Sequence, residues 1–191
     1  MKSKDIDTYI AEGVDARKNI DLNLLFEIAR VIEATLSKGG KIILFGNGGS
    51  ASQAEHIAGE FVGKFKKERK AWPAIALNSN SSIVTAIAND YSYDYVFERQ
   101  IEGYAKDCDI AIGITTSGNS ESVIRALSKA KKIGCITVAL TGGSGGKLNG
   151  MRGTLDYLVK VKSESTPIIQ EVHITIGHLL AAIVEDSMMV K

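Results

Sequence analysis

Apolar residues follow two alternating patterns along the chain. Short runs of consecutive apolar residues predict strands buried on both faces, and apolar residues spaced three or four apart predict helices. Strands that alternate with helices indicate an α/β fold with a parallel sheet between two helical layers. Strands are predicted over residues 41–45, 74–77, 109–114, 135–140 and 155–161. Helices are predicted twice within residues 1–40, over 51–65, once or twice within 81–105, over 121–132, and from Pro167 to about residue 185.

The chain is predicted to form a single domain over residues 1–191. This length suits one domain with one core, and no stretch has the length or composition of a linker. The two helices within residues 1–40 are too few to form a core alone. We expect this pair to pack on the sheet or on a neighbouring subunit.

The composition is that of an ordinary globular protein. Hydrophobic residues make up 45% and charged residues 24% of the chain, which excludes disorder as its main state. The formal net charge of +1 gives no global reason to expect nucleic acid or an anionic membrane as a partner. Basic residues gather at positions 64–70, where a solvated loop is the simpler interpretation. A small neutral or anionic ligand is therefore expected.

No membrane-spanning or secretory segment is predicted. No apolar run approaches the length needed to cross a bilayer, and the first residues alternate in polarity instead of forming an apolar leader. Cys108 and Cys135 each lie in a short apolar run, which favours reduced, buried thiols over a disulfide. We therefore expect a cytoplasmic protein.

Loops of small residues follow three of the predicted strands, over residues 46–50, 115–120 and 141–146. Such loops lie at the carboxyl ends of parallel strands, where ligands bind, and the helix that follows directs free amides at an anion. Residues 115–120 carry four hydroxyls, which favours a phosphate site over an ordinary turn capped by Ser120. A dinucleotide is disfavoured, because the second strand ends at Leu77 and Asn78 and not at an acidic residue.

A second kind of chemistry is suggested by His56 and Glu60, which lie one turn apart on a predicted helix. This spacing suits two metal ligands, although a solvent-facing pair is the commoner interpretation. The last predicted helix is apolar on nearly every face, so its Gln170 and His178 are either satisfied core residues or parts of an internal site. His173 is expected at the surface near the start of that helix.

Gln170 and His178 are eight residues apart, or about 12 Å of helix rise, which is a long span for one metal ion. Either Gln170 reaches the ion from the start of the helix, or a second subunit closes the site.

Several segments together resemble the phosphoheptose isomerases, a family of sugar-isomerase (SIS) domain proteins. The resemblance covers essentially the whole chain and implies the three-layer SIS fold: a flavodoxin-like, five-stranded parallel sheet with helices on both faces and two leading helices. The segments are Phe45–Ser50, His56 with Glu60, Ala86 with Asn89 and Asp90, Thr115–Ser120, Leu140–Gly142, and Ile169–Glu171 with His173 and His178.

The resemblance implies an aldose–ketose isomerase that converts sedoheptulose 7-phosphate to D-glycero-D-manno-heptose 7-phosphate through an enediol, the first step of bacterial ADP- or GDP-heptose synthesis. It implies a cytoplasmic homotetramer with active sites between subunits, and Glu60 and His178 as the acid–base pair. One zinc ion per subunit is implied at His56, Glu60, Gln170 and His178. The implied substrate contacts are Asn47, Gly48, Gly49, Glu60, Asn89, Asp90, Thr115, Thr116, Ser117, Ser120 and Gln170.

Two alternatives to this function are open. Relatives of these isomerases act without enzymatic activity, as tetrameric partners of the bacterial replication initiator. The joint presence of the four residues of the implied metal set argues against that role. An isomerase acting on another phosphosugar is the second alternative. The sequence does not distinguish it from an isomerase of sedoheptulose 7-phosphate.

Overall fold

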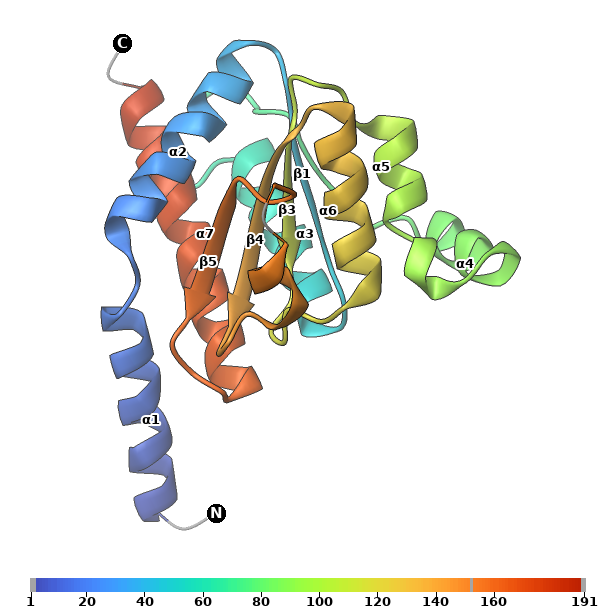
Figure 1. Cartoon of the computed structure of the whole chain (residues 1–191). Helices are drawn as coiled ribbons and strands as arrows, with labels where there is room; N and C mark the ends of the chain where they lie inside the picture. The colour runs from blue at the N-terminus through green and yellow to red at the C-terminus, as the bar shows by residue number, and fades with distance from the viewer. Residues whose placement is uncertain (1–2, 152, 190–191) are drawn as a thin grey trace.

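Five parallel strands form the centre of the computed structural model, which describes residues 3–151 and 153–189 (Figure 1). The sheet order is β2-β1-β3-β4-β5, the flavodoxin-like order. The predicted α/β fold is therefore confirmed. The strands are β1 (Ile42–Gly46), β2 (Ala74–Ala76), β3 (Ile110–Ile114), β4 (Ile136–Gly142) and β5 (Tyr157–Val161).

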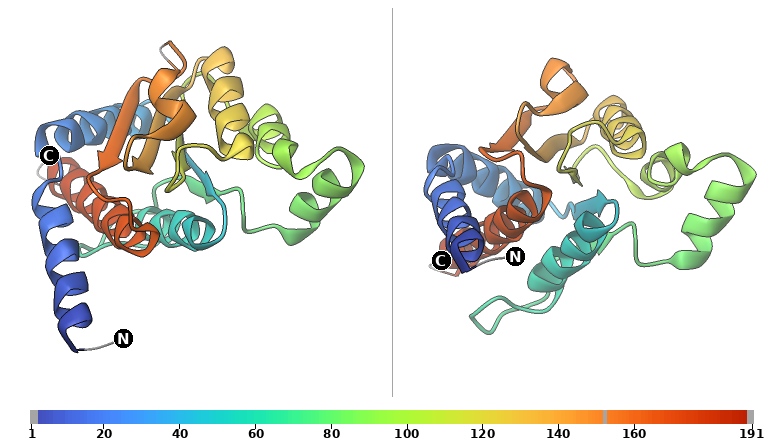
Figure 2. Two further views of the ribbon diagram at one scale, coloured as in Figure 1. Left: turned by 60° about the horizontal axis from the view of Figure 1, so that its bottom comes forward. Right: turned by 90° about the horizontal axis from the view of Figure 1, so that it is seen from below.

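Helices cover both faces of this sheet (Figure 2). On one face α2, α3 and α7 pack together, with α1 against α7, and on the other face α6 packs on the sheet and α5 on α6. The helices are α1 (Ser3–Lys18), α2 (Leu22–Ser37), α3 (Gly49–Val62), α4 (Ser81–Asp90), α5 (Glu98–Tyr104), α6 (Glu121–Ile133) and α7 (Thr166–Met188), with 3-10 turns η1 (Tyr93–Tyr95) and η2 (Gly146–Gly150).

The strand β1 shows how the sequence builds two cores at once. Its side chains point alternately to opposite faces, and all of its residues are buried. Ile42 and Leu44 join the core under α2, α3 and α7, whereas Ile43 and Phe45 join the core under α5 and α6. An uninterrupted apolar run is therefore required, and this requirement explains why the run predicted the strand.

Several element ends differ from the predicted ones. The helix expected over residues 51–65 ends at Val62, where Gly63 follows as its C-cap. The segment 81–105 contains two helices separated by a 3-10 turn. The strand β4 continues to Gly142, because Thr141 and Gly142 still pair with Lys160 and Val161 of β5.

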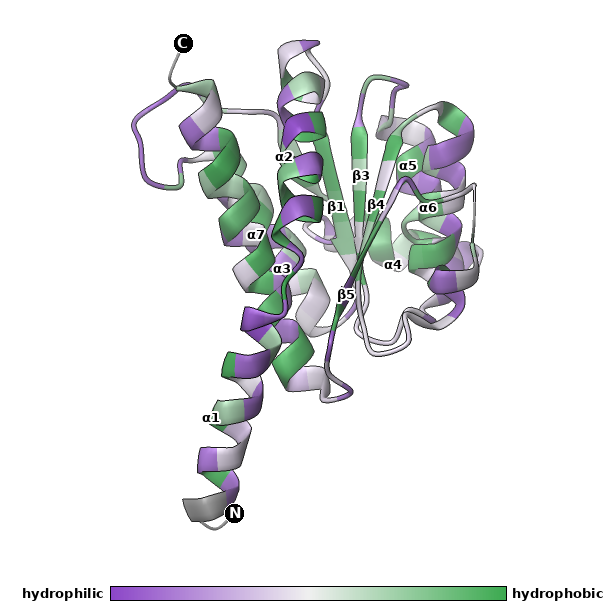
Figure 3. Cartoon of the chain, turned by 60° about the vertical axis from the view of Figure 1, so that its left-hand side comes forward, coloured by the Kyte–Doolittle hydropathy of each residue, from purple (hydrophilic) through white to green (hydrophobic). Residues whose placement is uncertain are grey.

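The leading helices behave differently from each other. The helix α2 packs on α7 and contacts the sheet, whereas α1 extends away from the body (Figures 1 and 3). Glu171 of α7 holds α1 by accepting hydrogen bonds from Tyr9 and from Arg17 at 2.9 Å. Along α1 an apolar stripe stays exposed, formed by Ile6, Ile10 and Val14.

Among the described residues, α7 is the one helix that is long and apolar enough to cross a membrane by length and composition. The expectation that no apolar run has such a length was therefore wrong for this segment. Half of the most apolar window of α7 is buried in the protein, against α2, α3 and the sheet. A helix surrounded by packing partners has the same apolar composition, so α7 is a core helix of this fold.

The two cysteines are free thiols, as predicted. Cys135 is buried, and burial together with the nearby Asp109 carboxylate raises the pKa of its thiol to about 11. Cys108 is half-buried, so the expectation of burial holds for only one of the two.

His173 is fully buried, which corrects the expectation that it lies at the surface. Its Nε2 is 3.2 Å from the carbonyl oxygen of Thr141 at the end of β4. Burial lowers the pKa of His173 to about 4, and the hydrogen bond to Thr141 only partly offsets this effect. The imidazole is therefore neutral in the folded protein at neutral pH.

This burial predicts a pH-dependent loss of stability. The unfolded chain protonates His173 below about pH 6.5, whereas the folded protein does so only near pH 4. The contribution of the neutral, buried His173 to the free energy of unfolding is fully present above pH 6.5. Roughly 3 kcal/mol of that free energy is lost as the pH falls to 4. Urea unfolding at pH 7 and pH 4 should show this loss in the parent and a much smaller one in His173→Gln. Equal losses in both proteins would contradict the assignment.

Candidate active site

A cleft of about 320 Å³ lies at the carboxyl ends of β1 and β3. It collects seven of the predicted substrate contacts from two loops that are far apart in the sequence, together with an eighth, Gln170, near the start of α7. The lining residues are Asn47, Gly48, Gly49, Ser50, Ile114, Thr115, Thr116, Ser117, Ser120 and Gln170.

The loop after β3 offers hydroxyls and backbone amides to this cleft. Ser120 stands at the N-cap of α6 without capping it, and its hydroxyl lies 3.0 Å from that of Thr115. Gly118 has φ +67°, and a Cβ there would lie 2.0 Å from the carbonyl oxygen of Gly145. Only glycine allows these two loops to approach so closely. The uncapped start of α6 and the paired hydroxyls favour an anion site over an ordinary capped turn.

The loop after β1 is held in a fixed orientation. The side chain of Asn47 donates to Ser122 at 3.0 Å and accepts from the Tyr93 hydroxyl at 2.9 Å. Gly48 has φ +57° and begins α3 without a side-chain cap. A Cβ on Gly49 would lie 2.5 Å from Nε2 of Gln170, so this glycine makes room for the Gln170 side chain. No local pattern indicates Tyr93, because its contact with Asn47 spans 46 positions.

Three residues converge at the seam where α3 and α7 pack, and we call His56, Glu60 and His178 the seam cluster. The two imidazole Nε2 atoms lie 3.0 Å apart. Oε1 of Glu60 is 3.0 Å from Nε2 of His56 and 3.9 Å from Nε2 of His178. One ligand atom from each residue lies within 4.8 Å of the others.

The donor set of the seam cluster fits a zinc ion. Around a tetrahedral zinc ion with bonds of about 2.0–2.1 Å, ligand atoms lie about 3.4 Å apart. The three observed separations depart from this value by about half an ångström or less. Two imidazole nitrogens that face each other can both present lone pairs when their protons reside on Nδ1. The arrangement therefore has the atoms and spacing of a three-residue metal site.

Gln170 is separate from the seam cluster within one chain. Its side chain lies against Gly49 in the cleft, and its backbone carbonyl accepts from Gln53 of α3. About 12 Å of helix rise separate it from His178. Of the four residues in the implied metal set, the structure brings three together and places Gln170 beside the predicted phosphate site.

Asn89 and Asp90 are not brought to the cleft. They are exposed at the end of α4, where Asn89 donates to Asp90 at 2.9 Å. The helix α4 projects from the body of the chain on the side away from α7 (Figure 2). Neither residue lines the cleft that contains the other predicted substrate contacts.

Comparisons with known proteins show what the whole chain is similar to. The family model described as "SIS domain" matches residues 9–142. A protein of Thermoplasma acidophilum named probable phosphoheptose isomerase is 50% identical over 182 residues, which cover 95% of this chain and 98% of that protein. The Aquifex aeolicus phosphoheptose isomerase is 51% identical over 162 residues, 85% of this chain and 83% of that protein.

Solved structures extend the similarity to the fold. A phosphoheptose isomerase from Francisella tularensis superposes with a TM-score of 0.91 and 34% identity, covering 97% of this chain and 100% of the other. The enzyme from Neisseria gonorrhoeae gives a TM-score of 0.89 and 35% identity, covering 96% and 98% of the two chains. The similarity therefore includes the leading helices as well as the sheet.

Proposed function

This chain belongs to the phosphoheptose isomerase family of SIS-domain proteins, and on that premise we propose that it interconverts sedoheptulose 7-phosphate and D-glycero-D-manno-heptose 7-phosphate. The resemblance predicted from the sequence is confirmed by the comparisons. The observation that carries the proposal is the pairing of a hydroxyl- and amide-lined cleft with a His–Glu–His cluster on α3 and α7, the two helices whose first turns also contribute Gly49, Ser50 and Gln170 to that cleft.

The cleft is proposed to bind the phosphate. The hydroxyls of Thr115, Thr116 and Ser117, with the amides at the start of α6, can donate to phosphate oxygens. Asn47 and Gln170 present amide groups to the same cleft and would bind the sugar end of the substrate. Neither loop carries an acidic side chain that would repel the phosphate.

The seam cluster is proposed to carry the proton transfers. Isomerisation moves one proton between C1 and C2 through an enediol, and a second proton between the oxygens O1 and O2. The Glu60 carboxylate would take and return the carbon-bound proton, and the His178 imidazole would move the proton between O1 and O2. Groups positioned in this way contribute rate factors of about 10² to 10⁴ each.

We propose one zinc ion per subunit, held by His56, Glu60 and His178. When bound there, it would polarise the substrate carbonyl as a Lewis acid. The carboxylate of Glu60 is then shared between two tasks, because a coordinated oxygen is a poorer base than a free one. A second subunit must close the site for Gln170 to complete the ligand set.

We further propose a cytoplasmic homotetramer with active sites between subunits. The exposed stripe of Ile6, Ile10 and Val14 on the projecting α1 supports an additional packing partner. The position of Asn89 and Asp90, away from the cleft of their own chain, supports a contribution to another subunit's site. A neighbouring copy would then supply the Asn89 and Asp90 side chains that the cleft of a single chain lacks.

The role of a non-enzymatic partner of the replication initiator has no support in the comparisons, since the relatives reported above are named as isomerases. Incubation of the purified, zinc-loaded protein with sedoheptulose 7-phosphate tests the proposal directly. Formation of the heptose 7-phosphate, detected by chromatography, is the expected result. Absence of product, with conversion of a different ketose phosphate, would replace the proposed substrate.

A further inference from the structure

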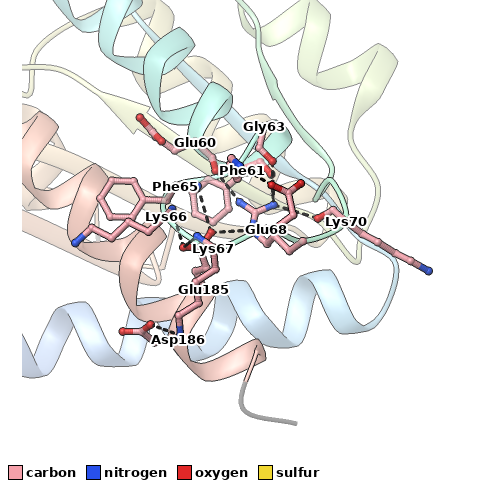
Figure 4. Close-up of polar contacts among 12 residues, drawn as sticks. Glu60, Phe61, Gly63, Phe65, Lys66, Lys67, Glu68, Lys70, Glu185 and Asp186 are labelled. Carbon is pink, nitrogen blue, oxygen red and sulfur yellow. Dashed lines mark hydrogen bonds and ion pairs between the residues drawn. The ribbon is translucent and has the colours of Figure 1, made fainter.

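A buried ion pair anchors the loop that follows α3 (Figure 4). The side chains of Glu185 on α7 and Arg69 in the loop are only 1% and 2% exposed, and Nε of Arg69 donates to Glu185 at 3.1 Å. Glu185 also accepts from the backbone amides of Phe65 at 3.2 Å and of Lys66 and Lys67 at 2.8 Å each. Three consecutive amides that point at one carboxylate form an anion nest supplied from within the chain.

The Arg69 side chain also contacts the backbone of α3. The guanidinium of Arg69 donates to the carbonyl oxygens of Glu60 at 2.7 Å and Phe61 at 2.9 Å. These carbonyls belong to the last turn of α3 and have no partner within the helix. The guanidinium lies 3.7 Å from the centre of the Trp72 ring, which fixes its plane. Arg69 therefore holds the backbone of a seam-cluster residue.

The same loop places an aromatic ring on the seam cluster. The Phe65 ring stacks on the imidazole of His178, with centroids 5.6 Å apart and planes inclined by 29°. The amide of Phe65 is one of the three held by Glu185. Because Glu185 follows His178 by two helical turns, one face of α7 carries both the anchor and the imidazole. The two helices that meet at the seam are thus joined through one loop.

We propose that Glu185 and Arg69 are positioning residues for the seam cluster and act through the Phe65 ring. The anchor fixes residues 63–69, the fixed loop holds Phe65 against His178, and the stacked ring keeps Nε2 of His178 directed at His56 and Glu60. The opposing effects on the pKa of the Glu185 carboxyl support a permanent anchor. Burial raises the pKa of its carboxyl, but the loop amides and Arg69 outweigh burial and hold that pKa below its usual value.

This inference rests on the proposed zinc site, and the experiment separates the two. Zinc affinity is measured by competition with a chromophoric chelator for the parent, Phe65→Leu and Glu185→Gln. Phe65→Leu removes the ring from a half-buried loop position and leaves the ion pair intact, so it tests the proposal without disturbing the buried charges. We expect both variants to bind zinc about 10- to 100-fold more weakly than the parent.

Two controls identify a positioning effect. Phe65→Tyr keeps the ring and should restore the affinity, and Glu68→Gln removes an exposed carboxylate of the same loop without touching the anchor. Visible spectra of the cobalt-substituted proteins should change in Phe65→Leu but not in Phe65→Tyr or Glu68→Gln. Circular dichroism and the Tm of the metal-free proteins report folding separately.

Two results would overturn the inference. If folded Phe65→Leu binds zinc and gives cobalt spectra like the parent, the ring does not position His178, although the zinc site itself stands. If the parent binds no zinc at this cluster, the proposed metal site fails and the positioning role fails with it.

Discussion

Glu60→Gln is expected to lower kcat for sedoheptulose 7-phosphate by about two to four orders of magnitude. The amide has the shape of the carboxylate but cannot accept the carbon-bound proton, so the enediol forms only by slower routes. Substrate binding rests mainly on the separate cleft loops, so KM should change much less than kcat. Steady-state kinetics of parent and variant, each with measured zinc content, check this expectation.

The matched control for this variant is Glu55→Gln, on an exposed position of the same helix five residues before Glu60. It removes the same charge from α3 without altering the seam cluster, and its kcat should equal that of the parent. A Glu60→Gln enzyme with parental turnover and parental zinc content would show that another group takes the proton.

His178→Ala is expected to lose both metal affinity and turnover, because the imidazole is proposed as zinc ligand and as proton carrier. The useful comparison is with His56→Ala, which removes a proposed ligand of the same type but no proton carrier. At saturating zinc, His178→Ala should remain slower than His56→Ala by a factor of about 10² or more. Activity titrations with zinc for both variants provide the measurement.

Equal turnover of the two variants at saturating zinc would contradict the proton-carrying role of His178 while leaving its role as a ligand. Parental zinc affinity in both variants would contradict the metal site. The pair of substitutions therefore tests the two proposed roles of one imidazole separately.

The sheet could be predicted because burial on both faces leaves a local pattern. The run Ile42–Phe45 is apolar without interruption because its alternate side chains enter two different cores. The cleft was predictable for a related reason: parallel strands place their following loops at one edge, so the loops at residues 46–50 and 115–120 had to meet. Their small residues and hydroxyls then indicated an anion.

Other features leave no local pattern. In α7 nearly every face is apolar, so periodicity did not show which polar side chain is covered, and His173 was wrongly placed at the surface. The loop after α3 is held by the contact of Arg69 with Glu185, which are 116 positions apart. Spacing along α7 puts about 12 Å of helix rise between Gln170 and His178, but only the structure places Gln170 against Gly49.

The most direct measurement for the whole account is the isomerisation of sedoheptulose 7-phosphate in deuterated water, followed by NMR. Transfer of a carbon-bound proton through a base that exchanges with solvent predicts deuterium at C2 of the heptose 7-phosphate, and no incorporation with Glu60→Gln over the same time. Product formed by the parent without any deuterium at C2 would contradict the exchange of this proton through Glu60, and no product at all would contradict the proposed activity.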